Sequence, residues 1–139
     1  MKNIIYTDAG YCRTKQQQQR KTGIIAYKIN QNETEMFEWS VKEIQGLQQY
    51  SNLFELLAAL LALVEANRLE LKDVLLKTDS QVCMYWLKRK KNNLRKFSEQ
   101  HFKFKELTDI LIKKIGVKIQ QISRDFNEAG WKIEQQYNL

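Results

Sequence analysis

The longest hydrophobic segment of the chain, Leu53–Val64, reads LFELLAALLALV and is apolar almost all the way round a helix. Such a helix packs on both sides or lies flat on a sheet, so we predict that it forms the centre of the fold, with Ser51 or Asn52 as its N-cap. Glu55 is the polar exception. A buried carboxylate without a partner costs roughly several kcal/mol, unless it reaches water from the first helical turn, where the helix dipole favours an anion.

Shorter β-branched and aromatic runs predict strands on both sides of this helix. Three runs precede it and are joined by polar segments, which indicates an antiparallel meander. Two more follow it, and the first of these, separated from the first strand by a helix, should run parallel to that strand. The predicted strands are Asn3–Thr7, Gly23–Ile29, Glu35–Val41, Asp73–Thr78 and Val117–Ile122, with Arg13–Lys21 as an exposed loop.

Further helices are predicted at Ser80–Lys88, at Phe102–Ile115 and from Asn127 onward. The second of these ends at Gly116 and carries apolar residues at helical spacing: Phe104, Leu107, Ile110, Leu111 and Ile115. The element order β, β, β, α, β, α, α, β, α indicates a mixed sheet with helices on its faces, an α/β fold. No proline, linker or repeat divides the chain, so residues 1–139 are expected to form a single domain.

The composition narrows the class of protein. The longest apolar run is shorter than the ~20 residues of a membrane span, and an early Asp8 argues against a secretory signal, so no membrane partner and a cytoplasmic location are expected. Cys12 and Cys83 lack the spacing of a zinc site. His101 is the only histidine, which argues against Ser/His/Asp and Cys/His catalysis. The net charge of +7 indicates a polyanionic partner, most simply nucleic acid. Nothing implies a protein partner, so a monomer is expected.

Three acidic residues occupy comparable places in the predicted fold. Asp8 follows the first strand, Asp79 follows the fourth, and Glu55 lies in the first turn of the helix between them. Parallel neighbouring strands present their carboxyl ends at one edge of a sheet, where α/β proteins place their sites. Carboxylates held together need a cation such as Mg²⁺ between them, and two ions ~4 Å apart can activate water against a phosphodiester. Alternatively, the aspartates are ordinary strand-end residues, with Asp79 capping the next helix.

Four motifs carry a family resemblance that spans essentially the whole chain: TDAG at residues 7–10, NLFELLAALLAL from residue 52, TDSQ at residues 78–81 and RDFNEAG at residues 124–130. In this order the chain resembles ribonuclease HI of the compact prokaryotic type. The resemblance implies a ribonuclease H-like fold in which three antiparallel strands are followed by two parallel ones. It also implies two Mg²⁺ or Mn²⁺ ions and cleavage of the RNA strand of RNA/DNA hybrids, leaving 5′-phosphate and 3′-hydroxyl ends.

Carried over by motif, the resemblance implies that Asp8, Glu55 and Asp79 are catalytic metal ligands. Asn52 and Gln81 resemble the family's minor-groove contacts, which suits recognition of the RNA 2′-hydroxyl. The basic run of residues 88–96 resembles in position the segment that family members place against the DNA backbone. This implies nucleic-acid contacts from Lys88, Arg89, Lys90 and Lys91, whereas the alternative is a solvated charged face.

The end motif departs from the family pattern. It usually reads NxxAD, and the position of its acid, four residues after Asn127, holds Trp131 here. Asp125 is the first candidate for a substitute fourth catalytic acid, and Glu128 and Glu134 are the others. Trp131 therefore leaves a second hypothesis open, in which the domain binds hybrids or duplexes without cutting them. Another nuclease of the superfamily, a resolvase or a 3′ to 5′ exonuclease, is less favoured, because the exonuclease type needs an Asp-x-Glu pair on the first strand.

Overall fold

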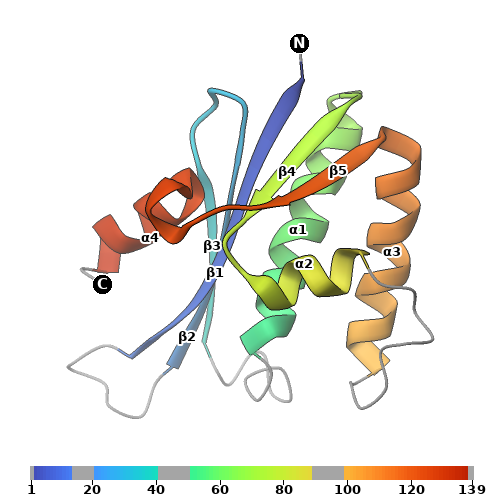
Figure 1. Cartoon of the computed structure of the whole chain (residues 1–139). Coiled ribbons are helices and arrows are strands. Elements are labelled where there is room, and N and C mark those ends of the chain that lie inside the picture. Colours follow the sequence, from blue (N-terminus) through green and yellow to red (C-terminus); the bar gives the residue numbers. More distant parts are fainter. Residues whose placement is uncertain (1, 14–20, 41–50, 89–98, 138–139) are drawn as a thin grey trace.

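The structure, a computed structural model, describes residues 2–13, 21–40, 51–88 and 99–137. Its centre is one five-stranded sheet in the order β3-β2-β1-β4-β5 (Figure 1). β1 pairs antiparallel with β2 and parallel with β4, β2 is antiparallel to β3, and β4 is parallel to β5. This confirms the predicted mixed sheet of three antiparallel strands followed by two parallel ones. The strands are β1 Asn3–Arg13, β2 Lys21–Ile29, β3 Glu35–Ser40, β4 Val74–Thr78 and β5 Val117–Gln121.

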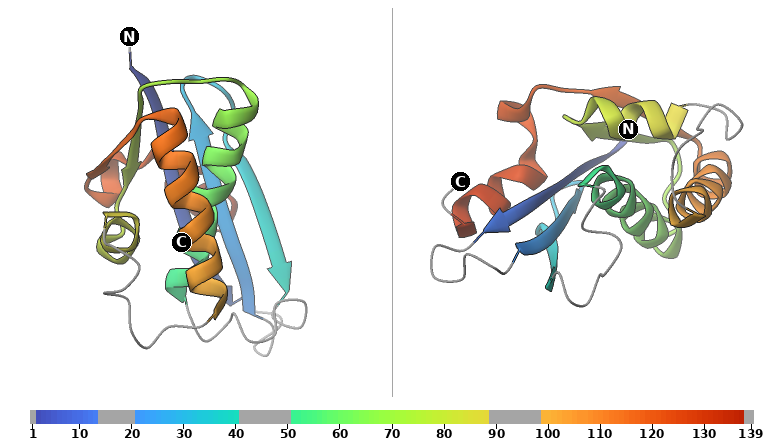
Figure 2. Two further views of the ribbon diagram at one scale, coloured as in Figure 1. Left: turned by 90° about the vertical axis from the view of Figure 1, so that its right-hand side faces the viewer. Right: turned by 90° about the horizontal axis from the view of Figure 1, so that it is seen from below.

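Helices cover both faces of this sheet. They are α1 Ser51–Arg68, α2 Gln81–Lys88, α3 Glu99–Ile115, the short 3₁₀ helix η2 Arg124–Phe126 and α4 Glu128–Tyr137. Figure 2 shows α1 and α3 on one side of the strands and α4 on the other. The predicted order of strands and α-helices is confirmed, and η2 is an addition that the sequence pattern does not predict. In the described part of the chain, the helices all fall short of the length and apolar character needed to cross a membrane.

The alternation of side chains along the strands explains the two layers. Val74 and Leu76 of β4 point into the main core with Leu56 and Leu63 of α1. On β2, the neighbours Ile24 and Ile25 point to opposite faces, because Ile25 packs with Phe54 and Ala58 of α1. Ile24 packs with Ala129 and Ile133 of α4. α1 thus lies between the sheet and α3, as its sequence predicts.

Local sequence explains several helix ends. The Ser80 hydroxyl oxygen accepts a hydrogen bond from the Cys83 backbone N–H at 3.0 Å, so Ser80 caps α2 and leaves the neighbouring Asp79 free of that task. Gly116 follows α3 with φ of 80°, a left-handed conformation that glycine adopts without steric cost.

β1 is longer than its apolar run predicts. It was expected to end at Thr7, but it continues to Arg13, where it pairs with Lys21 of β2. The parallel pairing with β4 does stop at Thr7 and Thr78. Asp8 is therefore the residue at which β1 parts from β4 while β2 still holds its backbone. The ends of the predicted loop, Arg13 and Lys21, belong to strands, and the segment between them lies outside the described residues.

The buried face of α3 was predicted from its apolar spacing, and that prediction is partly wrong. Leu107 and Ile110 are exposed, whereas Lys105 and Thr108 are buried. The Lys105 ammonium donates to Asp109 Oδ1 at 2.6 Å and to the Leu87 carbonyl at 3.3 Å, and these partners offset the cost of burying its charge.

Candidate active site

The three predicted acids meet at one point of the sheet edge. Asp8 comes from β1 and Asp79 follows β4. Glu55 comes from the second turn of α1, so its predicted place in the first turn was wrong. One carboxylate oxygen of each lies within 4.8 Å of those of the other two. The parallel register of β1 and β4 brings Asp8 beside Asp79, since each directly follows the last paired residue of its strand.

The electrostatics of this acidic triad, Asp8, Glu55 and Asp79, favour a cation. Burial raises the pKa of the Asp8 carboxyl to about 7, and the charge of Asp79 adds to the shift. Burial, followed by the charges of Asp8 and Asp79, raises the pKa of Glu55 well above its usual range. Glu55 Oε2 is buried and has no hydrogen-bond partner. An unpartnered buried oxygen among like charges fits a bound Mg²⁺ or Mn²⁺, which carboxylates hold.

The triad forms one side of a cavity of about 310 Å³. α4 forms much of the other side, through Gly130, Ile133 and Glu134. Arg124, the first residue of η2, also lines the cavity. Glu134 Oε1 accepts a hydrogen bond from Arg124 Nε at 3.3 Å. Its negative charge also contributes to the raised pKa of Asp8. Glu134 therefore lines the same cavity as the triad, but it is not one of the acids whose oxygens lie within 4.8 Å of one another. The full lining is Asp8, Ala9, Gly10, Glu55, Asp79, Arg124, Gly130, Ile133 and Glu134.

The other two candidates for a fourth acid lie elsewhere. Asp125 is exposed in η2 and does not line the cavity; its backbone carbonyl accepts the Trp131 indole N–H at 3.0 Å. Trp131 itself is half exposed and is also absent from the cavity wall. Glu128 accepts a hydrogen bond from Lys28 Nζ at 2.8 Å, which links α4 to the face of β2 that it covers. Of the three candidates, only Glu134 lines the cavity of the triad. It lies one helical turn after Trp131, so the sequence points to it only if the fourth acid is allowed to move by one turn along the helix.

The predicted nucleic-acid contacts are described only in part. Gln81 is exposed at the start of α2, two residues after Asp79, and Lys88 is exposed at the end of the same helix. Arg89, Lys90 and Lys91 lie outside the described residues. Asn52 is in the first turn of α1, and its side chain is not described.

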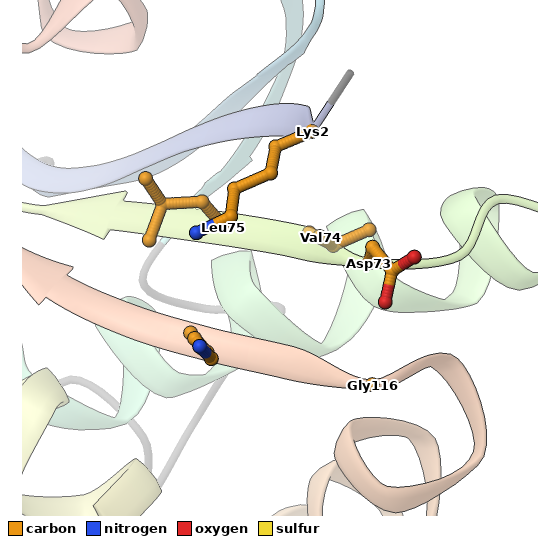
Figure 3. A pocket seen from close by; sticks show the side chains of 6 residues that line it. Lys2, Asp73, Val74, Leu75 and Gly116 are labelled. Carbon is orange, nitrogen blue, oxygen red and sulfur yellow. The ribbon is translucent and has the colours of Figure 1, made fainter.

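Another hollow, of about 350 Å³, opens at the opposite end of the parallel strands. Figure 3 shows Lys2 lying along β4 over Leu75, with Asp73 where that strand begins. Lys118 and Gly116 of the neighbouring chain segment complete its polar lining. This hollow has one carboxylate and two lysines and lacks the convergent acids of the first cavity, so it is the poorer candidate for a metal site.

Comparison with known families decides the relationship that this geometry suggests. The family model described as RNase H matches residues 1–124. The chain belongs to the RNase H family. The match ends at Arg124, before the segment that holds Trp131. No curated protein matches the sequence.

Solved structures of this family share the fold. RNase H1 of the halophilic archaeon Halobacterium salinarum is 15% identical, with a TM-score of 0.61 over 93% of this chain and 91% of that one. LC11-RNase H1, isolated from compost by a metagenomic approach, is 16% identical, with a TM-score of 0.67 over 99% of this chain and 96% of that one. The same LC11 enzyme in complex with an RNA/DNA hybrid gives 20% identity and a TM-score of 0.59, covering 91% and 89%.

Proposed function

We propose that this protein is a metal-dependent endonuclease that hydrolyses the RNA strand of RNA/DNA hybrids, leaving 5′-phosphate and 3′-hydroxyl ends. The observation that carries the proposal is the triad of Asp8, Glu55 and Asp79, with oxygens within 4.8 Å of one another in a member of the RNase H family. The hybrid bound by LC11-RNase H1 supports the choice of substrate.

The residues of the cavity suit hydrolysis without a protein nucleophile. None of the described residues that line it is a serine, threonine, cysteine, histidine or lysine. Asp8, Glu55 and Asp79 would hold two Mg²⁺ or Mn²⁺ ions, with Glu134 as the fourth carboxylate. When bound, such ions activate water and stabilise the leaving oxygen of a phosphodiester. The guanidinium of Arg124 supplies positive charge at the cavity and lowers the pKa of Asp8 against the larger effect of burial.

Substrate contacts are assigned to residues near this cavity. Gln81 and Asn52 flank the triad in sequence and would contact the minor groove, where the 2′-hydroxyl separates RNA from DNA. Lys88, Arg89, Lys90 and Lys91 would follow the DNA phosphates, an interaction that weakens with salt. The protein would act as a monomer in the cytoplasm.

Replacement of Asp79 by asparagine tests the proposal. We expect Asp79→Asn to lose cleavage of an end-labelled hybrid in Mg²⁺ or Mn²⁺ while its circular dichroism spectrum stays that of the wild type. Asp73→Asn, at the opposite end of β4, is the matched control and should cut at the wild-type rate. Wild-type turnover in Asp79→Asn would overturn the assignment.

A second function, hybrid binding without cleavage, is favoured by Trp131 at the usual position of the fourth acid. The same assay separates the two. A wild-type protein that binds the hybrid without producing fragments, together with fragments from Trp131→Asp, would support the binding module. Fragments from the wild type that disappear in Asp79→Asn would support the nuclease.

A further inference from the structure

Asn127 is a polar side chain that is completely buried, with 0% of its surface exposed. It lies between η2 and α4 in the chain and contacts Thr7, in the middle of β1, and Asp79, directly after β4. In the sequence, Asn127 is notable only as the asparagine of the end motif. A buried amide must find partners for its donors and its acceptor, so its surroundings reveal what it holds together.

The hydrogen bonds of Asn127 fix the orientation of its amide. Nδ2 donates to the backbone carbonyl of Thr7 at 2.9 Å and to Asp79 Oδ2 at 3.2 Å. Oδ1 accepts from the Ala129 N–H at 3.2 Å. The reversed amide would place its oxygen against a carbonyl and a carboxylate, both of which only accept, so one orientation satisfies all three partners.

This orientation has a direct consequence for Asp79. The amide occupies Oδ2 of the carboxylate and leaves Oδ1 for another partner. Because the donor is neutral, it restrains the carboxylate without the positive charge of a lysine or arginine, which would oppose the binding of a cation nearby. Groups that orient a metal-binding side chain in this way commonly affect metal affinity or activity 10–100-fold, roughly.

The same residue sets the start of α4. Its side chain caps the first turn through Ala129, and its backbone carbonyl accepts the Gly130 N–H at 3.0 Å. The bond to Thr7 ties this turn to the strand that carries Asp8. One side chain therefore connects β1, the Asp79 carboxylate and the helix that presents Glu134.

We propose that Asn127 is a positioning residue of the cation site: its amide aims the Asp79 carboxylate and fixes the start of α4 relative to the triad. The proposal rests on the proposed metal-dependent function. In this role Asn127 does not contact the substrate.

Asn127→Ser separates the two roles of the side chain. Serine is as good an N-cap as asparagine, but it is too short to reach from this position to Asp79. We expect the variant to keep its helical circular dichroism signal and to bind Mn²⁺ about 10–100-fold more weakly by calorimetry. Asn32→Ser, in the exposed turn after β2, is the matched control and should bind Mn²⁺ like the wild type. Equal Mn²⁺ affinity in Asn127→Ser and wild type would overturn the proposal.

A second measurement needs no variant. In NMR spectra of the wild-type protein, the side-chain amide resonances of Asn127 should shift when Mg²⁺ is added, while those of Asn32 stay in place. Bound Mg²⁺ with unmoved Asn127 resonances would overturn the positioning role and leave the metal-dependent function standing. A wild-type protein that binds neither Mg²⁺ nor Mn²⁺ would overturn both.

Discussion

Glu134 differs from the other acids near the end of the chain in what it faces. It lines the cavity of the triad, and its charge acts on Asp8. Glu128, on the first turn of the same helix, is turned toward Lys28 and Tyr6; these two partners lower its pKa, with Lys28 the larger cause. Asp125 is exposed. Glu134 lies three residues, about one helical turn, after Trp131, and residues three apart share a face of a helix.

Isosteric amide variants test this assignment. We expect Glu134→Gln to lower the rate of hybrid cleavage by about tenfold or more, because a charge facing the cation site is lost. Asp125→Asn should cut like the wild type. Glu128→Gln should also keep its activity but lose about 1 kcal/mol of stability in thermal denaturation, since a partly buried hydrogen bond between charges is weakened. Full activity in Glu134→Gln would remove it from the site.

Residues whose place is set by strand order could be predicted from sequence, whereas the role of residues that depend on the docking of α4 could not. Asp8 and Asp79 each follow an apolar strand, so their meeting needs only the parallel pairing of β1 with β4. Glu134 depends on how closely α4 approaches Asp8, and no periodicity in the sequence measures that approach. Asn127 looks like an ordinary helix cap until its contact with Asp79 is seen.

At the scale of elements, α4 approaches β1 so closely that Gly130 leaves no room for a larger residue. A Cβ atom built on Gly130 would lie 2.6 Å from Asp8 Oδ2. Alanine favours a helix by about 1 kcal/mol over glycine, so the helix itself would gain from the change. The contact is with the end of a short side chain, and we therefore expect the carboxylate to move rather than the helix to unfold.

Gly130→Ala should accordingly keep or slightly raise the melting temperature and weaken Mn²⁺ binding. Gly10→Ala is the matched control, because Gly10 lines the same cavity and a Cβ there meets nothing within 4 Å. Calorimetric titration with Mn²⁺ and a thermal melt of both variants provide the comparison. Unchanged Mn²⁺ affinity in Gly130→Ala would show that the Asp8 carboxylate has room to spare.

The order of the elements follows from hydrophobic periodicity, whereas their ends follow from partners. β1 extends past its apolar run because β2 supplies hydrogen bonds as far as Arg13. α3 buries Lys105 because Asp109 and the Leu87 carbonyl lie within its reach. β2 and the Leu87 carbonyl come from other parts of the fold, so a window of sequence around β1 or α3 does not contain them.

At the scale of the whole molecule, a chain of net charge +7 gathers four acids in one cavity, the triad and Glu134. Like charges and burial disfavour the ionised forms of Asp8 and Glu55, so without metal the site opposes folding at neutral pH. Between the ordinary pKa of 3.8 and the raised pKa of about 7, folded Asp8 holds a proton that the unfolded chain releases. The resulting stability is fully present below pH 4 and is lost as the pH rises through 7.

We therefore expect the melting temperature of the metal-free protein to fall between pH 5 and pH 8. The free energy of unfolding falls by about 1.4 kcal/mol for each unit by which a pKa is raised. Mg²⁺ or Mn²⁺ should restore stability at pH 8 and have little effect at pH 5. Asp8→Asn, measured without metal, should flatten the profile. A metal-free melting temperature that rises from pH 5 to pH 8 would contradict this account.

The hydrogen bond between Asn127 and Thr7 joins residues 120 positions apart. During synthesis on a ribosome, the triad emerges long before Asn127, whose amide holds the Asp79 carboxylate. A nascent chain therefore has no completed cation site until α4 has left the exit tunnel and docked.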